Sequence, residues 1–178
     1  MSSTPPDPIA QLKERIRDIP DFPKPGILFK DVTPLLGHGP SFRQATSLLA
    51  NRVEPYAPDA VVGIESRGFI FGAALAERLG VGFIPVRKPG KLPWRRIRET
   101  YALEYGTDAL ELHEDAVEGR RVVVIDDLLA TGGTAAATGR LVERAGGRVA
   151  AFAFAVELGF LGGRAKLGAT PCESLITF

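Results

Sequence analysis

RVVVIDDLLATGGT, the stretch from Arg121 to Thr134, has the pattern of a buried strand followed by a ligand-binding loop. Its β-branched run, Val122 to Ile125, is typical of a strand buried on both faces of a parallel sheet. Glycines in the loop allow backbone N–H groups to approach an anion, and the helix predicted over 135–144 adds a favourable dipole. Because ligands bind beyond the carboxyl ends of such strands, the stretch predicts a phosphate site.

Two adjacent carboxylates, Asp126 and Asp127, indicate what else binds there. Carboxylates repel phosphate, but they accept hydrogen bonds from ribose hydroxyls and can bind the waters of a Mg²⁺ ion. Neither the Walker pattern nor the dinucleotide-binding fingerprint is present in the stretch. A phosphorylated sugar is therefore the favoured substrate class, and a solvated Asp-Asp turn is the alternative.

Length and composition indicate a single domain, 1–178, and argue against several classes of partner. With 178 residues the chain can bury a sound core, and its formal net charge of +1 gives no field for nucleic acid or a membrane surface. The single cysteine, Cys172, fits a reducing cytoplasm. The sequence shows no apolar run of transmembrane length and no signal-peptide pattern. We expect residues 1–8 to form a mobile tail.

The alternation of apolar runs and helical segments predicts an α/β fold with a doubly wound, mostly parallel sheet. Its strands are expected at 60–64, 81–86, 122–125, 149–156 and 174–178. Helices are expected over 41–54, with Ser41 as the cap, and over 69–79, ended by Gly80.

A second strand-to-helix loop contains Arg67, which can bind phosphate oxygens with two parallel hydrogen bonds. A surface ion pair is the alternative for Arg67. Further along, Pro89 to Thr100 combines prolines, glycine and arginines, which predicts a mobile lid over an anionic substrate. An ordinary solvated loop is the alternative there. The alternating pattern of Tyr101 to Leu112 predicts a hairpin with a turn at 106–108, and 26–36 by itself predicts a surface loop.

The chain resembles the type I phosphoribosyltransferases, through the central motif RVVVIDDLLATGGT. Five further stretches, in this order, resemble the members that use adenine as the base: PDFPKPGILFKDVTPLL, GIESRGFIFGAALA, VRKPGKLPW, ETYALEYGTDALELH and VELGFLGGR. Together these stretches cover most of the chain from about Pro20 onward.

This resemblance implies transfer of the 5-phosphoribosyl group from 5-phosphoribosyl-1-pyrophosphate to adenine, giving AMP and pyrophosphate. It implies Mg²⁺ as the cofactor, held through substrate and water with no direct protein ligand. It also implies a homodimer, a lid over about 88–103, and two base-covering segments at about 20–36 and 157–167. A cis peptide bond is expected between Glu65 and Ser66.

Residue roles follow from the same resemblance. The ribose and its 5′-phosphate are expected at Asp126, Asp127, Ala130, Thr131, Gly132, Gly133 and Thr134. Pyrophosphate is expected at Ser66, Arg67, Arg87, Lys88 and Lys91. Adenine is expected at Leu28, Phe29, Lys30 and Leu158, with Phe29 stacking on the purine; core packing is the alternative for Phe29. Arg67 and Glu104 are the expected catalytic residues, and Glu104 would act as acid and base.

Two alternative functions stay open. The first is the same chemistry on another purine, although a 6-oxo purine would favour a lysine where this chain has Leu158-Gly159-Phe160. The second is a regulator that senses phosphoribosyl pyrophosphate without catalysis. Such a regulator would need a helix-turn-helix or a strongly basic face, and the sequence indicates neither.

Overall fold

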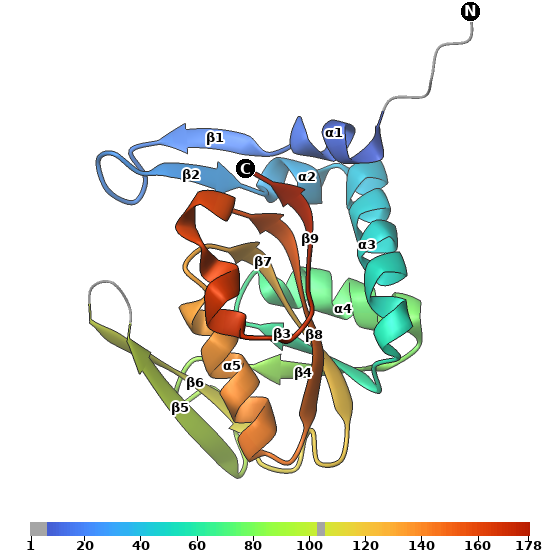
Figure 1. Ribbon diagram of the computed structural model, residues 1–178, viewed down its shortest axis with the longest axis vertical. Coiled ribbons are helices and arrows are strands. Elements are labelled where there is room, and N and C mark those ends of the chain that lie inside the picture. The colour runs from blue at the N-terminus through green and yellow to red at the C-terminus, as the bar shows by residue number, and fades with distance from the viewer. Residues whose placement is uncertain (1–6, 103–105) are drawn as a thin grey trace, which may run out of the picture.

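A five-stranded parallel sheet forms the centre of the computed structural model, which describes residues 7–102 and 106–178 (Figure 1). Its strands lie in the order β4 (Gly82–Val86), β3 (Ala60–Ile64), β7 (Arg121–Leu129), β8 (Arg148–Glu157) and β9 (Cys172–Thr177). The predicted α/β class and parallel sheet are therefore confirmed.

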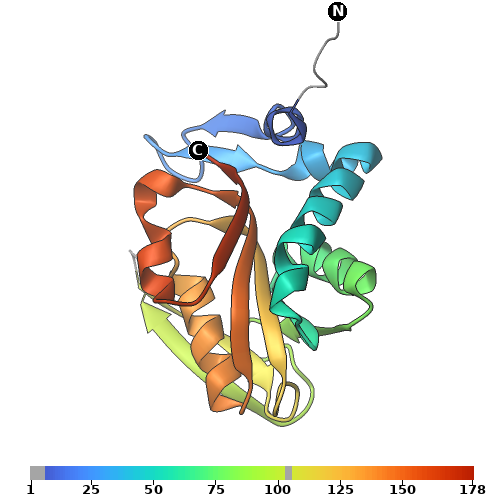
Figure 2. The same ribbon diagram turned by 45° about the vertical axis from the view of Figure 1, so that its right-hand side comes forward.

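Helices cover both faces of this sheet, as Figures 1 and 2 show. On one face, Val123 and Ile125 pack in a core with residues of α1 (Pro8–Lys13), α2 (Thr33–Gly37), α3 (Gly39–Val53) and α4 (Gly68–Leu79). On the other face, Val122 and Val124 pack against α5 (Gly133–Arg144). Because successive strand residues point to opposite faces, one β-branched run supplies both cores.

Smaller elements extend the domain at both sides of the sheet. Two antiparallel hairpins are formed by β1 (Arg17–Pro20) with β2 (Leu28–Asp31), and by β5 (Arg96–Ala102) with β6 (Thr107–His113). The 3₁₀ turns are η1 (Glu54–Tyr56), η2 (Gly159–Leu161) and η3 (Gly163–Leu167). Within the described residues, no helix combines the length and the apolar character that crossing a membrane requires.

Of three expectations about the first half of the chain, two were only partly right and one is confirmed. The segment 26–36 is not a loop throughout, because it contains β2 and α2. Ser41 does not cap α3; the helix begins two residues earlier, and the Nδ1 atom of His38 accepts from the Ser41 N–H at 3.4 Å. Gly80 does end α4, in the left-handed conformation with φ of 67°.

The lid and the central strand also differ from expectation. Strand β5 begins at Arg96, so part of the predicted lid is regular β-structure, and Thr107 and Asp108 belong to β6 rather than to a turn. Strand β7 continues to Leu129. Asp126 and Asp127 therefore lie inside the strand rather than past its end, and Asp126 pairs with Phe154 of β8.

Candidate active site

The loop between β7 and α5 surrounds a small cavity of about 90 Å³. Asp126 contributes to the lining from β7, and the loop contributes Ala130, Thr131, Gly132, Gly133 and Thr134. Gly132 caps α5 with φ of 78°, a conformation that glycine adopts without a steric penalty. The cavity thus lies at a helix N-terminus, where N–H groups and the helix dipole favour an anion.

The same loop is in close backbone contact with the first turn of η3, which begins at Gly163. A Cβ atom on Gly132 would lie 2.3 Å from the carbonyl oxygen of Gly163, and one on Gly163 would lie 2.2 Å from the carbonyl oxygen of Ala130. Arg164 holds this turn, because its Nε and Nη2 atoms donate to the Glu157 carboxylate at 2.7 Å. The segment 157–167 and the phosphate loop therefore depend on each other for position.

Arg67 connects the loop after β3 with the end of β7. Its Nε atom donates to Oδ2 of Asp127, whose side chain is buried. Burial disfavours the charge on Arg67, but the hydrogen bond and the charge of Asp127 outweigh this and raise the pKa of the guanidinium. The residue after Arg67, Gly68, packs directly against the end of β7, because a Cβ atom at this position would lie 2.8 Å from Oδ1 of Asp126.

The peptide bond between Glu65 and Ser66 is cis, as the resemblance to the type I phosphoribosyltransferases implies.

Asp126 differs sharply from Asp127 in its electrostatic environment. Burial, followed by the negative charge of Asp127, raises the pKa of Asp126 well above its usual value of 3.8. Its Oδ1 atom accepts a hydrogen bond from the Asp127 N–H at 2.8 Å. Of the two adjacent carboxyls, Asp127 is the one that pairs with Arg67, and Asp126 is the one whose pKa is raised.

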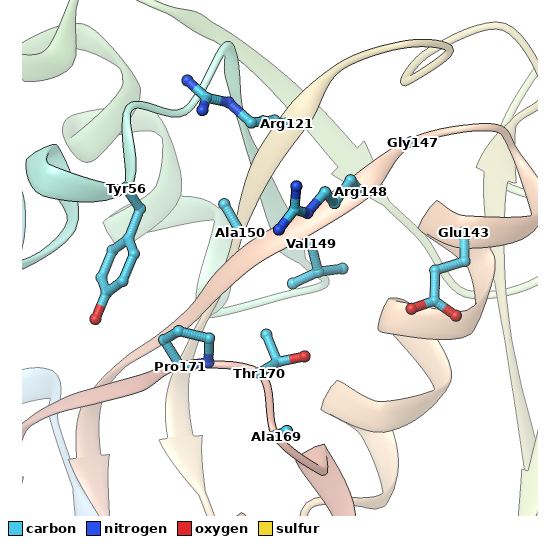
Figure 3. A pocket seen from close by; sticks show the side chains of 10 residues that line it. All are labelled: Tyr56, Arg121, Glu143, Gly147, Arg148, Val149, Ala150, Ala169, Thr170 and Pro171. Atoms are coloured by element: carbon cyan, nitrogen blue, oxygen red, sulfur yellow. The ribbon is translucent and has the colours of Figure 1, made fainter.

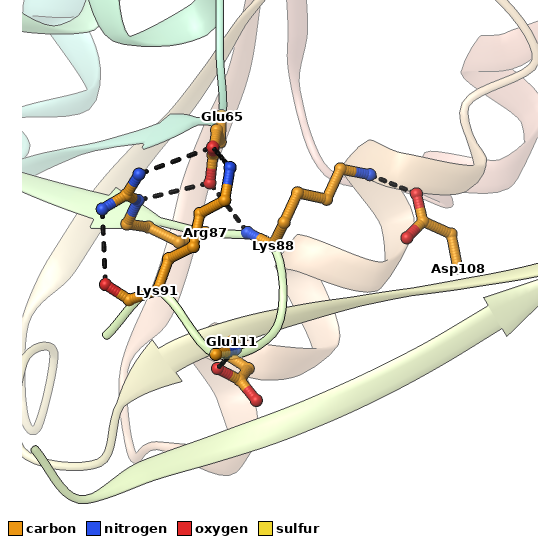
Figure 4. A network of polar contacts seen from close by, with 7 residues as sticks. Glu65, Arg87, Lys88, Lys91, Asp108 and Glu111 are labelled. Atoms are coloured by element: carbon orange, nitrogen blue, oxygen red, sulfur yellow. Dashed lines mark hydrogen bonds and ion pairs between the residues drawn. The ribbon is translucent and has the colours of Figure 1, made fainter. Parts of the chain in front are cut away.

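Glu65 accepts hydrogen bonds from three residues that were expected at the pyrophosphate site (Figure 4). Its carboxylate accepts from Nε of Arg87 at 3.2 Å, from the N–H of Lys88 at 2.9 Å and from Nζ of Lys91. Burial alone would raise the pKa of Glu65, but these donors together lower it to about 2. Glu65 thus holds Arg87 and Lys91 side by side next to the loop that contains Arg67.

Lys88 points away from Glu65, and its Nζ atom donates to Oδ2 of Asp108 on β6 (Figure 4). The two predicted pyrophosphate lysines therefore pair with different carboxylates. Neither Glu65 nor Asp108 was assigned a role from the sequence. Asp108 was missed because it stood in a predicted turn.

The predicted base-covering residues divide into two groups. Phe29 on β2 lies near the site, because the Arg67 guanidinium carbon is 5.5 Å from the centre of its ring. Leu158 is 8% exposed, and its N–H donates to the Leu129 carbonyl at 2.9 Å. Leu28 instead is 48% exposed, and the Lys30 side chain is buried against Asp18. Of the four, Phe29 is therefore the residue that lies against Arg67.

The expected acid and base, Glu104, lies outside the described residues. Among the described ranges, 7–102 and 106–178, no three His, Cys, Asp or Glu side chains are grouped so that they could hold a metal ion.

A larger cavity, of about 550 Å³, lies at the other end of the sheet (Figure 3). Arg121 and Arg148, the first residues of β7 and β8, contribute to its lining together with Tyr56. Ligands of parallel sheets bind beyond the carboxyl ends of the strands. The smaller cavity after β7 is therefore the better candidate for the active site.

Comparison with known proteins agrees with this geometry. The phosphoribosyl transferase domain model matches residues 31–164. The adenine phosphoribosyltransferase of Roseiflexus sp. (strain RS-1) is 59% identical over 168 residues, which cover 94% of this chain and 98% of the relative. The crystal structure of the Thermoanaerobacter pseudethanolicus adenine phosphoribosyltransferase superposes with a TM-score of 0.93 at 54% identity, covering 96% and 99% of the two chains.

A third relative was crystallised with ligands. The Saccharomyces cerevisiae adenine phosphoribosyltransferase, in complex with adenine and an imino-altritol bisphosphate, superposes with a TM-score of 0.90 at 42% identity, covering 94% of this chain and 98% of that one. The fold, together with the loops after β3 and β7 that Arg67 and Asp127 join, defines a phosphoribosyltransferase domain. Within that class, the chain belongs to the adenine phosphoribosyltransferase family.

Proposed function

We propose that this protein transfers the 5-phosphoribosyl group from 5-phosphoribosyl-1-pyrophosphate to adenine, with AMP and pyrophosphate as products. The observation that carries the proposal is the contact between Arg67 and Asp127, which joins the loops after β3 and β7. Anion-binding groups on one loop and ribose-binding groups on the other suit a substrate that has a phosphate at each end. Relatives named for adenine disfavour both another purine and a non-catalytic sensor.

The loop after β7 would hold the phosphoribosyl group. Backbone N–H groups of residues 130–134 and the Thr131 and Thr134 hydroxyls are the donors available to the 5′-phosphate. Asp126 and Asp127 would bind the ribose hydroxyls. Phosphate binding fixes the orientation of the sugar without taking part in the bond that breaks.

The leaving pyrophosphate needs positive charge, because breaking its bond to the sugar leaves a multiply charged anion. Arg67, Arg87, Lys88 and Lys91 would supply that charge, together with the N–H of Ser66. In the described residues these four side chains already pair with carboxylates. Pyrophosphate binding would therefore exchange carboxylate partners for phosphate oxygens.

Adenine would lie between Phe29 and Leu158, with backbone groups of Leu28 and Lys30 at its edge. Glu104 would accept and return the purine proton as the ring nitrogen attacks the sugar. Glu104→Gln should then lower kcat about 10²–10⁴-fold while the KM for phosphoribosyl pyrophosphate stays nearly constant. A small change in both constants would make Glu104 a lid residue instead.

We further propose Mg²⁺ as cofactor, the homodimer as the assembly and the cytoplasm as the location. The residues fit a metal carried by the substrate, because the Asp126 and Asp127 carboxylates can accept hydrogen bonds from the waters of the ion. When bound, Mg²⁺ would neutralise charge on the pyrophosphate oxygens.

Formation of AMP and pyrophosphate in equal amounts from adenine and phosphoribosyl pyrophosphate tests the proposal. Asp127→Asn keeps the shape of the side chain but removes the charge opposite Arg67. We expect kcat/KM for phosphoribosyl pyrophosphate to fall about 10- to 100-fold, as for loss of a charged hydrogen bond worth roughly 1.5–3 kcal/mol. An unchanged kcat/KM would remove Asp127 from the site.

A further inference from the structure

Lys88 and Asp108 form an ion pair between the segment after β4 and the start of β6 (Figure 4). Both side chains keep access to solvent, with exposed fractions of 37% and 27%. The second carboxylate oxygen of Asp108, Oδ1, accepts from the Ala109 N–H at 2.8 Å. Asp108 is therefore fixed by its own strand, whereas the longer Lys88 side chain is free to change partners without moving β6.

A buried tyrosine shares the same oxygen of Asp108. The hydroxyl of Tyr101, on β5, lies 3.2 Å from Oδ2 of Asp108, and Oγ1 of Thr134 lies 3.2 Å from that hydroxyl. A carboxylate can only accept, so the one hydroxyl proton of Tyr101 goes to Asp108, and Thr134 donates to Tyr101. A chain of hydrogen bonds thus joins the phosphate loop to the carboxylate that holds Lys88.

The charges of the pair are mutually stabilised. Burial acts to lower the pKa of Lys88, but its hydrogen bond to Asp108, the charge of Asp108 and the contact with Tyr101 together raise that pKa. Burial likewise acts to raise the pKa of Asp108, but the hydrogen bonds from Lys88, the Ala109 N–H and Tyr101, with the charge of Lys88, together lower that pKa. Lys88 can reach a phosphate oxygen only after it leaves a charged partner.

We propose that Asp108 is a resting counter-ion that competes with pyrophosphate for Lys88, and that the Tyr101 hydroxyl sets the strength of this competition. The proposal rests on the proposed function, because it takes Lys88 as a ligand of pyrophosphate. When Lys88 moves to pyrophosphate, Oδ2 of Asp108 still accepts the hydrogen bond from the Tyr101 hydroxyl. Tyr101 therefore lowers the cost of releasing Lys88 and acts as a positioning residue.

Two neighbouring substitutions should then change pyrophosphate affinity in opposite directions. Asp108→Asn removes the competing charge but keeps an oxygen that accepts from Tyr101, so pyrophosphate should bind about two- to fivefold more tightly, as expected for a partly exposed ion pair. Tyr101→Phe keeps the buried ring and removes the hydroxyl. Oδ2 of Asp108 would then lose its hydrogen bond from Tyr101 and would be left with Lys88 as its donor. Pyrophosphate should then bind about two- to fivefold more weakly.

The test is a calorimetric titration of the folded protein with inorganic pyrophosphate in the presence of Mg²⁺. Tyr56→Phe is the matched control, since its hydroxyl donates to Glu173 at 2.7 Å at the other end of the sheet, and we expect no change. In a Lys88→Met background, Asp108→Asn should no longer tighten binding, because the contested partner is gone.

Equally weaker pyrophosphate binding by Asp108→Asn and Tyr101→Phe would overturn the proposal, because the Lys88–Asp108 pair would then only stabilise the hairpin. Unchanged affinity in both variants would overturn it as well. An unaltered protein that forms AMP and binds pyrophosphate, with no gain in Asp108→Asn, would refute the counter-ion and leave the proposed function intact. Failure of the unaltered protein to bind pyrophosphate would refute both.

Discussion

Asp126 holds a proton more firmly in the folded protein than in the unfolded chain, because burial and then the Asp127 charge raise its pKa above 3.8. The folded state therefore binds more protons than the unfolded state once the pH exceeds about 4. The free energy of unfolding should lose this contribution progressively as the pH rises from about 4 through the folded-state pKa.

Asp126→Asn removes this titration and keeps an oxygen that accepts the Asp127 N–H. Relative to the unaltered protein, we expect its thermal stability to improve steadily as the pH rises above about 4, while turnover falls through loss of a ribose contact. Thermal unfolding of both proteins from pH 4 to pH 9 measures the difference. A stability difference that is the same at every pH would contradict the raised pKa.

Single side chains were predictable where their chemistry is local. The glycine–threonine loop and its two carboxylates predict a phosphate and ribose site because each residue type has few other uses at that place, and the loop does line a cavity at the N-terminus of α5. Partner choice was not predictable in the same way. Lys88 pairs with Asp108, and Lys91 pairs with Glu65. These pairs depend on the directions in which the side chains point, which the local sequence pattern does not show.

A carboxylate of β5 helps to fix the β5–β6 hairpin to α5, in addition to the hydrogen bond between Thr134 and Tyr101. Glu99 of β5 accepts from Nε of Arg140 at 2.6 Å and from Nη1 of Arg144 at 2.8 Å. The hydrogen bond from Arg140 is the main cause of the lowered pKa of Glu99. Strand β5 was assigned to a loop because its arginines obscure an alternation in which Ile97, Glu99 and Tyr101 face the molecule.

Glu99→Gln should loosen this attachment without affecting the central sheet. We expect amide hydrogen exchange in β5 to become about two- to fivefold faster, since a weakened ion pair of this kind is worth up to about 1 kcal/mol. Exchange in β3 and β7 should not change. Glu114→Gln is the control, because the Glu114–Arg95 pair is exposed and its atoms are 3.7 Å apart. Equal effects of both substitutions would contradict an anchoring role for Glu99.

The contact between the phosphate loop and the turn at Gly163 makes a second prediction for a structural element. Gly163→Ala would place a methyl group 2.2 Å from the Ala130 carbonyl oxygen, so one backbone must move. We expect a loss of about 1–3 kcal/mol in stability and weaker binding of AMP, measured by denaturant unfolding and by titration. Gly37→Ala, which meets no atom within 4 Å, is the control. Unchanged AMP binding in Gly163→Ala would mean that the two segments move independently.

The arrangement of the whole domain follows from its four internal apolar runs. A run buried on both faces can only be an inner strand of a covered sheet, so the parallel α/β class was predictable from 60–64 and 122–125. The strand order was not, and it matters because β3 and β7 are neighbours. This pairing brings Arg67 to Asp127, although 60 residues separate them in the chain.

A panel of purines tests the central claim most directly. The unaltered protein is supplied with phosphoribosyl pyrophosphate, Mg²⁺ and one of adenine, hypoxanthine, guanine or xanthine, and kcat/KM is measured for each base. The account predicts AMP from adenine and a kcat/KM for the 6-oxo purines that is lower by several orders of magnitude, because a site built for one pattern of donors and acceptors leaves polar groups unpaired with another. Comparable rates with hypoxanthine or guanine, or no nucleotide from adenine, would contradict it.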